Sequence, residues 1–204
     1  MHWHSMYKKN QRYVLLDRDG VINRRIIGGY VTSWEQFEFL PRSLEALRLL
    51  NESGYRVIVV SNQACVGKGL LSATELESIT RRFLLEVALS GGHVVDVYYC
   101  RHQTEDRCNC RKPQSGLLVR AQNEHRFIPE ETYLIGDSPS DMHAAEAAGC
   151  PSILIQRGAF LGSPVRNEDS LLVTSNLYDA AEMIIAMQSM RGMEHALIRR
   201  SNGV

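Results

Sequence analysis

The chain has 204 residues, of which 44% are hydrophobic and 23% are charged, and this size and composition predict one domain, residues 1–204, with a buried core. Its 23 basic and 23 acidic residues cancel, which excludes the strong overall field of a nucleic-acid or membrane-surface binder. Its longest apolar runs, such as residues 57–60, are far shorter than the roughly 20 residues of a membrane span. Residues 1–10 lack the apolar segment of a signal peptide, so a cytoplasmic protein is expected.

Short β-branched runs alternate with helical patterns along the chain, which is typical of βαβ units. Strands are predicted at 13–16, 56–60, 94–99, 132–135 and 152–155. Helices are predicted from Pro41 to a C-terminal glycine at 54, and over 72–89, 115–125, 139–148 and, as a C-terminal tail, 176–198. The pattern predicts an α/β fold, with a central parallel sheet that is covered on both faces.

Four polar signals follow in one order, each at the end of an apolar run. They are Asp17-Arg-Asp19-Gly, Ser61-Asn62, Arg111-Lys112-Pro113, and Gly136-Asp137 with Asp141 four residues later. In an open parallel sheet, ligands gather at the carboxyl ends of the strands. We therefore expect these side chains to form one site.

The residue types of these signals suit phosphoryl transfer. A phosphate monoester is a dianion, so a carboxylate can attack it only where cations neutralise the charge. Asp17 and Asp137 offer hard oxygen ligands for Mg²⁺. Lys112 would neutralise the nucleophile and the phosphoryl oxygens, and Ser61 would offer a hydroxyl group. Asp141 is expected in the first turn of a helix, where it favours the helix dipole and anchors the metal shell.

The run from residue 13 to Asn23, taken with the three later signals, resembles the haloacid-dehalogenase (HAD) superfamily of phosphatases over about residues 12–160. The resemblance implies a Rossmann-like three-layer αβα sandwich with a minimal cap. It also implies that Asp17 is the nucleophile that forms an aspartyl-phosphate. Asp19 would be the general acid that protonates the leaving alcohol and then activates water, and its backbone carbonyl would complete the Mg²⁺ ligands.

A cluster of cysteines precedes Lys112. Cys100, His102, Cys108 and Cys110 provide three thiolates and an imidazole on a short loop, which predicts a closed, structural, tetrahedral Zn²⁺ site. Its expected effect is to hold the loop directly before Arg111 and Lys112. The two remaining cysteines, Cys65 and Cys150, are expected to be reduced.

Within the superfamily, this zinc loop resembles the branch that contains the heptose bisphosphate phosphatases and the histidinol-phosphate phosphatases. The segments 29–31, 37–41 and 61–69 are more similar to the heptose enzymes. This implies removal of the 7-phosphate of D-glycero-D-manno-heptose 1,7-bisphosphate during synthesis of nucleotide-activated heptose for surface polysaccharide. Histidinol phosphate, a substrate of histidine biosynthesis, is the alternative. Cys65, Lys68 and the longer stretch 24–28 depart from the usual heptose pattern.

No insertion is long enough for a folded cap, so the site should be open and shaped by the loops 24–38, 62–70 and 101–111. The candidate substrate-binding residues are Asn62, Gln63, Lys68 and Arg111. The resemblance implies substrate recognition by Arg111, and a second phosphate is expected near Arg111 or Lys68. The other cations of these loops, Arg24, Arg25 and Arg101, are expected to be ordinary solvated charges.

Two alternatives to a sugar phosphatase are a non-catalytic binding module and a phosphatase that acts on protein or nucleic acid. A non-catalytic zinc-stabilised binding module would be expected to lose Asp17, Asp19, Lys112 or Asp137, and all four are present. A nucleic-acid phosphatase is disfavoured by the neutral charge and the lack of an aromatic and basic stripe. A phosphopeptide substrate stays open, as does the oligomeric state, for which a monomer is compatible with the sequence.

Overall fold

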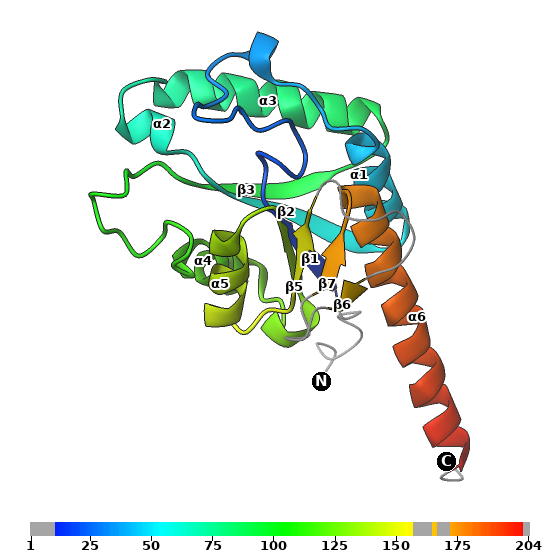
Figure 1. Cartoon of the computed structure of the whole chain (residues 1–204). Coiled ribbons are helices and arrows are strands. Elements are labelled where there is room, and N and C mark those ends of the chain that lie inside the picture. Colours follow the sequence, from blue (N-terminus) through cyan, green and yellow to red (C-terminus); the bar gives the residue numbers. More distant parts are fainter. Residues whose placement is uncertain (1–10, 157–164, 167–171, 202–204) are drawn as a thin grey trace, which may run out of the picture.

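The computed structural model describes residues 11–156, 165–166 and 172–201, so the N-terminal segment 1–10 lies outside the described residues. The strands form one sheet in the order β3-β2-β1-β4-β5-β7-β6 (Figure 1). Their bounds are β1 Arg12–Leu16, β2 Tyr55–Asn62, β3 Val94–Cys100, β4 Tyr133–Gly136, β5 Ser152–Ile155, β6 Val165–Arg166 and β7 Leu172–Thr174. Strands β1 to β5 and β7 run parallel, and the short β6 pairs antiparallel with β7.

Helices cover both faces of the sheet, as predicted. Helices α1 (Ser43–Glu52), α3 (Ala73–Leu89) and α6 (Leu177–Ser201) pack on one face, and α4 (Gly116–His125) and α5 (Pro139–Ala147) pack on the other (Figure 1). The short elements η1 (Trp34–Gln36), α2 (Ala64–Gly67) and η2 (Pro129–Glu131) lie in connections. No helix in the described part of the chain has both the length and the apolar character of a membrane span.

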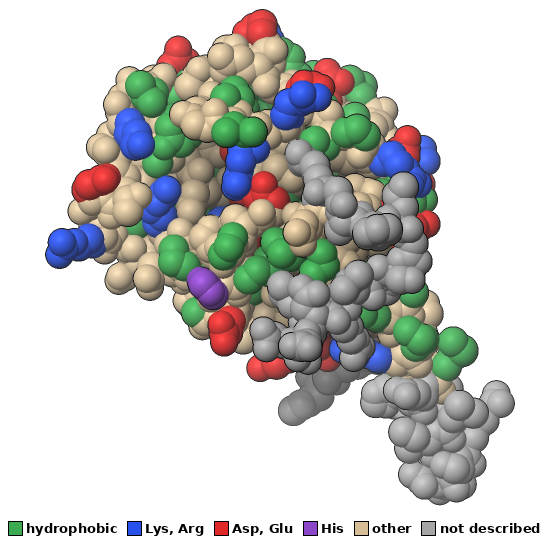
Figure 2. Space-filling view, viewed as in Figure 1, with side chains coloured by type: hydrophobic (Ala, Val, Ile, Leu, Met, Phe, Trp, Pro, Cys, Tyr) green, Lys and Arg blue, Asp and Glu red, His purple; other side chains and the backbone are tan. Residues whose placement is uncertain are grey.

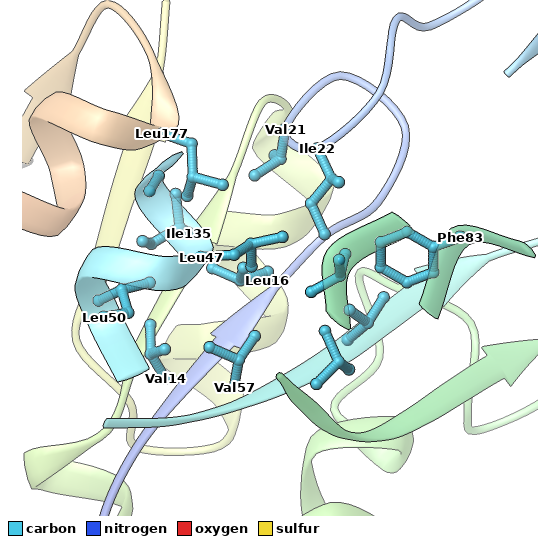
Figure 3. Packing of buried hydrophobic residues seen from close by; sticks show 14 of the residues in the cluster. Val14, Leu16, Val21, Ile22, Leu47, Leu50, Val57, Phe83, Ile135 and Leu177 are labelled. Atoms are coloured by element: carbon cyan, nitrogen blue, oxygen red, sulfur yellow. The ribbon is translucent and has the colours of Figure 1, made fainter. Parts of the chain in front are cut away.

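The two faces of the sheet follow from the alternation of side chains along each strand. In β1, Val14 and Leu16 point to the face covered by α1, whereas Tyr13 and Leu15 belong to the opposite core. Figure 3 shows Leu47 and Leu50 of α1 on the same side as Val14 and Leu16. Burial of each such leucine contributes about 1.5–3 kcal/mol, so the apolar stripe of α1 fixes this helix on the sheet.

The predicted helix ends are also present. At α3, the Glu75 backbone N–H donates to Ser72 Oγ at 3.2 Å and the Ser72 N–H donates to Glu75 Oε2 at 2.8 Å, which completes a capping box. Gly54 has a φ of +83° just after α1, the left-handed conformation that favours glycine. Strands β6 and β7 and the short helix α2 are not predicted by the sequence patterns, because two to four residues carry too little periodicity.

The topology places a switch point of the strand order at the carboxyl end of β1. The chain runs from β1 to β2 on one side, and β4 later pairs with the other side of β1. The loops that follow β1 and β4 therefore leave two neighbouring strands in different directions. Open α/β sheets bind ligands at such a switch point. Asp17 and Asp137 lie directly after these two strands.

Candidate active site

Three carboxylates meet at the carboxyl ends of β1 and β4. The Asp17 backbone N–H donates to the Ile135 carbonyl of β4 at 2.9 Å, which fixes the start of the loop. Asp137 follows β4, and Asp141 lies in the first turn of α5. One oxygen of each of the three carboxylates lies within 4.8 Å of the others. The predicted convergence of these residues is therefore present in the fold.

Lys112 provides the buried positive charge of this cluster. Its side chain is 2% exposed, and Nζ lies 2.9 Å from Asp17 Oδ1 and 2.5 Å from Asp141 Oδ1. Nζ also donates to the Val60 carbonyl at 2.8 Å. Burial opposes the charge of the lysine, but the two carboxylates outweigh it and raise the pKa of Lys112. The lysine therefore stays protonated beside the predicted nucleophile.

Asp141 connects Lys112 to the start of α5. Its Oδ2 accepts hydrogen bonds from the Ser138 N–H at 3.2 Å and from Ser138 Oγ at 2.6 Å. This forms a capping box at the helix N-terminus, while Oδ1 pairs with Lys112. Asp141 lies in the first turn as predicted. It also contacts Lys112 directly, so it helps to position the lysine.

The donor set fits Mg²⁺. Asp17 Oδ1, Asp137 Oδ1 and Asp141 Oδ1 are buried, and each lies beside a cationic side chain, Lys112 or Arg25, so these hard oxygens already face positive charge as ligands of a divalent cation do. Burial, together with repulsion from Asp17 and Asp141, raises the pKa of Asp137 to about 6 although Arg25 opposes the change. Burial likewise raises the pKa of Asp17, and Lys112 only partly offsets it. A divalent cation would relieve this concentration of negative charge.

Asp19 is held by a separate set of partners. The Arg18 Nη2 group donates to both carboxylate oxygens of Asp19, at 3.0 and 2.9 Å. Asn23 Nδ2 donates to Oδ1 at 2.8 Å, and Gln63 Nε2 donates to Oδ2 at 2.6 Å. Burial works against the charge of Asp19, but Arg18 and these hydrogen bonds outweigh it and lower the pKa of Asp19.

Sequence reasoning missed Arg18 and Asn23, which are both fully buried. Arg18 lies over the rings of Phe37 and Tyr99, each 5.7 Å from the guanidinium carbon. The signal was an arginine between two predicted catalytic carboxylates, where a surface charge would not be expected. The pattern of neighbouring residues, however, does not reveal that this side chain turns into the core.

Two glycines allow the close approach of the carboxylates. A Cβ at Gly20, whose φ is +100°, would lie 1.8 Å from Asp137 Oδ2. A Cβ at Gly136 would lie 2.3 Å from the Asp141 Cβ. Both distances are shorter than any side chain allows, so the glycines of the Asp19-Gly and Gly-Asp137 signals are required by the packing of the site.

The residues at the end of β2 position other site residues. Asn62 Nδ2 donates to the Lys112 carbonyl at 2.9 Å, and the Lys112 N–H donates to Asn62 Oδ1 at 3.0 Å. Ser61 is buried, and its Oγ accepts from Gln63 Nε2 at 3.2 Å. The amides of Asn62 and Gln63, predicted to bind substrate, thus contact Lys112 and Asp19. This positioning role was not predicted.

The four predicted zinc ligands are close together. The Sγ atoms of Cys100, Cys108 and Cys110 lie 3.4 to 3.7 Å apart, and His102 Nδ1 lies 3.2 Å from Cys110 Sγ and 3.7 Å from Cys100 Sγ. Tetrahedral zinc with Zn–S bonds of about 2.3 Å gives ligand separations of about 3.8 Å. All three cysteines are free thiols. The donor set therefore fits Zn²⁺ with no coordination position left for a substrate.

Hydrogen bonds attach the loop that carries the cysteine cluster to neighbouring elements. Gln103 Nε2 donates to the Gly67 carbonyl of α2 at 2.8 Å. The Gly116 N–H donates to the Asn109 carbonyl at 3.1 Å, and a Cβ at Gly116 would lie 2.3 Å from that oxygen. These contacts connect the cluster to α2 and to the start of α4.

Cations surround the acidic centre. Figure 2 shows acidic side chains at a central hollow with Lys and Arg side chains around it. Lys68 is exposed at the end of α2, with Nζ 5.3 Å from the centre of the Tyr30 ring. Arg111 is partly buried, and its Nη1 has no hydrogen-bond partner. Substrate binding by these two residues stays a prediction.

The remaining loop cations differ from one another. Arg24 and Arg101 form exposed ion pairs with Glu38 and Glu77, at 2.8 and 3.5 Å, which agrees with their expected surface role. Arg25 differs from that expectation, because its Nη2 lies 2.9 Å from Asp137 Oδ1. The loop that follows β1 turns this arginine towards the carboxylate cluster.

Known proteins resemble this chain in sequence and in fold. The HAD-hydrolase-like family model matches residues 109–180. D-glycero-alpha-D-manno-heptose-1,7-bisphosphate 7-phosphatase of Mycobacterium tuberculosis is 38% identical over 168 residues, which cover 79% of this chain and 88% of that protein. The chain belongs to the heptose-1,7-bisphosphate 7-phosphatase family of HAD-like hydrolases. This confirms the resemblance found in the sequence.

Two further relatives extend the comparison within the heptose-1,7-bisphosphate 7-phosphatase family. D-glycero-beta-D-manno-heptose-1,7-bisphosphate 7-phosphatase of Helicobacter pylori is 33% identical, over 84% of this chain and 95% of that protein. The crystal structure of D,D-heptose 1,7-bisphosphate phosphatase from B. bronchiseptica, complexed with magnesium and phosphate, has a TM-score of 0.79 and 29% identity. It covers 86% of this chain and 99% of that chain. The predicted α/β fold and phosphatase class are confirmed, and the magnesium of that structure supports the expected Mg²⁺.

Proposed function

We propose that this protein hydrolyses the 7-phosphate of D-glycero-D-manno-heptose 1,7-bisphosphate, in the synthesis of nucleotide-activated heptose. The observation that carries the chemistry is the position of Lys112 Nζ between Asp17 and Asp141, 2.9 and 2.5 Å from their oxygens. The choice of substrate is supported by the names of the relatives. Histidinol phosphate is the weaker candidate, because none of the relatives described above carries that activity in its name.

In the first half-reaction, Asp17 attacks the phosphorus atom. A bond forms between an Asp17 carboxylate oxygen and phosphorus, and the bond between phosphorus and the sugar oxygen breaks. Asp17, Asp137 and the Asp19 backbone carbonyl would hold Mg²⁺, which supplies positive charge for the meeting of two anions when it is bound. Lys112 stabilises the charge on the transferring oxygens, and Ser61 contributes its hydroxyl group.

Asp19 moves the protons of both half-reactions. As an acid, it gives a proton to the leaving sugar oxygen. As a base, it takes a proton from the water that attacks the aspartyl-phosphate, and this releases inorganic phosphate and Asp17. Arg18 favours the ionised form of Asp19, which suits the second step. The charge of a bound phosphate raises the pKa of a neighbouring carboxyl group, which favours the protonated form for the first step.

The test measures phosphate release with Mg²⁺ from heptose 1,7-bisphosphate and from histidinol phosphate in parallel. Both anomers of the heptose are included, because the relatives are named for either one. Asp17→Asn serves as the blank for contaminating phosphatase. A large preference for the heptose supports the proposal. A preference for histidinol phosphate overturns the substrate, and equal rates for wild type and Asp17→Asn overturn the nucleophile.

The setting of the reaction is part of the proposal. We infer a cytoplasmic enzyme of one domain that binds a small phosphorylated sugar with Arg111, Lys68 and the loops around the site. Five free cysteines, three of them in one cluster, suit a reducing compartment. Removal of zinc by a chelator, followed by measurement of the metal content, tests whether Cys100, His102, Cys108 and Cys110 bind it.

A further inference from the structure

Arg25 contacts a carboxylate of the proposed Mg²⁺ site. Its Nη2 lies 2.9 Å from Asp137 Oδ1, and the side chains of Arg25 and Asp137 are 45% and 15% exposed. Arg25 lies in the loop after β1, outside strands and helices. The contact is an ion pair that reaches from the rim of the site to its acidic centre.

Arg25 and Gly20 lie against different oxygens of the Asp137 carboxylate. Gly20 packs against Oδ2, because a Cβ at this glycine would lie 1.8 Å from Oδ2 but 3.1 Å from Oδ1. Oδ1 is buried, and the Arg25 guanidinium lies beside it. A metal ion bound through Oδ1 would therefore need the place that the guanidinium occupies.

The loop leaves Arg25 free to change its partner. Among the described residues, its guanidinium makes no ion pair besides the one with Asp137. Ile27 is 96% exposed, and no atom lies within 4 Å of a Cβ built on Gly28. The neighbouring Arg24 is more firmly held, since its side chain pairs with Glu38 and its N–H donates to the Glu38 carbonyl, both at 2.8 Å.

We propose that Arg25 competes with Mg²⁺ for Asp137 Oδ1 and, once displaced, binds a phosphate oxygen at the mouth of the site. A half-exposed ion pair is weak, so a divalent cation held by several carboxylates displaces it. A guanidinium binds phosphate oxygens through paired N–H groups. Metal and phosphate then bind cooperatively, because one releases the group that the other uses. The inference deepens the proposed function and rests on it for the metal site.

The test uses Mg²⁺ and inorganic phosphate as probes, which makes it independent of turnover. Calorimetric titration of Mg²⁺ into the full chain compares wild type with Arg25→Ala and with Arg24→Ala as the matched control. Arg25→Ala is expected to bind Mg²⁺ about threefold to tenfold more tightly, since a weak competitor is removed. At saturating Mg²⁺, the same variant is expected to bind inorganic phosphate about tenfold more weakly. The affinities of Arg25→Lys for Mg²⁺ and for phosphate should lie between those of wild type and Arg25→Ala.

The opposite signs of the two effects make the result specific. Unchanged or weaker Mg²⁺ binding in Arg25→Ala overturns the competition, and unchanged phosphate binding overturns the second role. Equal changes in Arg24→Ala would assign both effects to the net charge of the loop and overturn the proposal. If the enzyme proves to use another phosphoester, the two binding constants still decide the role of Arg25.

Discussion

The aspartate cluster and the cysteine cluster are both able to bind a metal ion, but the fold supports them differently. Asp17 and Asp137 follow neighbouring strands of the sheet, and Asp141 begins a helix, so backbone hydrogen bonds fix their positions. The cysteine cluster begins at the end of β3, and its other three ligands lie in a segment without helix or strand. The sheet therefore positions the first cluster, whereas we expect a metal ion to hold the second.

Lys112 connects these two regions. It is two residues beyond Cys110 in the sequence, and its ammonium group lies within the aspartate cluster. If the comparison is right, changes at the aspartates alter catalysis without altering zinc. Changes at the cysteines should alter both zinc and catalysis, because they act through the position of Lys112.

The largest effect is expected for Lys112→Met. This change leaves Asp17 and Asp141 buried without their counter-charge, which costs about 3–5 kcal/mol in the free energy of unfolding. Turnover should fall at least about 10³-fold, because the charge beside the nucleophile is lost. Denaturant titration and phosphate release measure the two effects.

Lys68→Met is the matched control for stability, because Lys68 is exposed. Its free energy of unfolding should stay within about 0.5 kcal/mol of wild type. Zinc content should be unchanged in both variants. Loss of zinc from Lys112→Met would contradict the division between the two regions.

The second prediction concerns the packing of the aspartate cluster. Gly20→Ala would place a Cβ 1.8 Å from Asp137 Oδ2 at a φ of +100°, so Asp137 must move. We expect a stability loss of about 2–4 kcal/mol and weaker Mg²⁺ binding, measured by calorimetry. Gly69→Ala has a similar backbone penalty at a φ of +68° but no atom within 4 Å, so it should lose about 1 kcal/mol and retain Mg²⁺ binding. Equal Mg²⁺ affinities in the two variants would show that close packing does not set the metal site.

Sequence reasoning predicted those parts of the site that depend on topology. The positions of Asp17, Asp137 and Lys112 follow from strand order and motif spacing, since parallel strands end at one edge of a sheet. The cysteine spacing was likewise sufficient to predict a four-ligand cluster. The α/β fold and its five main strands needed only the alternation of apolar runs.

Sequence reasoning did not predict the directions of individual side chains. Arg18 is buried beneath Asp19, and Arg25 turns inwards while Arg24 pairs at the surface. Two adjacent arginines have the same composition and charge, so only the path of the loop distinguishes them. The amides of Asn62 and Gln63 likewise contact protein groups whose distance in the sequence hides the contact.

The third prediction tests the cysteine cluster. Cys108→Ala removes one of four ligands, so the purified variant should contain less than one zinc per chain by elemental analysis. Without the metal, the loop before Lys112 loses its fixed shape. We expect a melting temperature about 4–8 °C lower, which corresponds to about 2 kcal/mol for a domain of this size, and turnover reduced about 10-fold to 100-fold.

Cys150→Ala is the matched control, because Cys150 lies outside the cluster in the core between the sheet and α5. It should lose some stability by leaving a small cavity but keep its zinc. Unchanged zinc in Cys108→Ala would argue against ligation by this thiol. Unchanged turnover in a zinc-depleted variant would show that the shape of the cysteine loop does not affect catalysis.

The smallest effect is expected for Asn62→Ala, which tests the connection between the two regions. Asn62 holds the backbone of Lys112 through two hydrogen bonds of 2.9 and 3.0 Å, from the end of β2. The variant retains every metal ligand and the Lys112 ammonium group, so zinc content and Mg²⁺ affinity should be unchanged. Loss of two hydrogen bonds should cost about 1–3 kcal/mol, and small misplacement of Lys112 should lower kcat about 10-fold.

The division of this effect between kcat and KM identifies its cause. Loss of a residue that contacts the ground-state substrate, the role predicted for Asn62 from the sequence, would raise KM. Loss of a residue that positions Lys112 would lower kcat. Asn62→Asp sharpens the distinction, because it retains the acceptor for the Lys112 N–H but places a carboxylate oxygen, in place of the amide donor, against the Lys112 carbonyl. If kcat falls in both variants while KM is constant, the end of β2 holds Lys112 for catalysis. The sheet then fixes the lysine from one side, and the cysteine loop from the other.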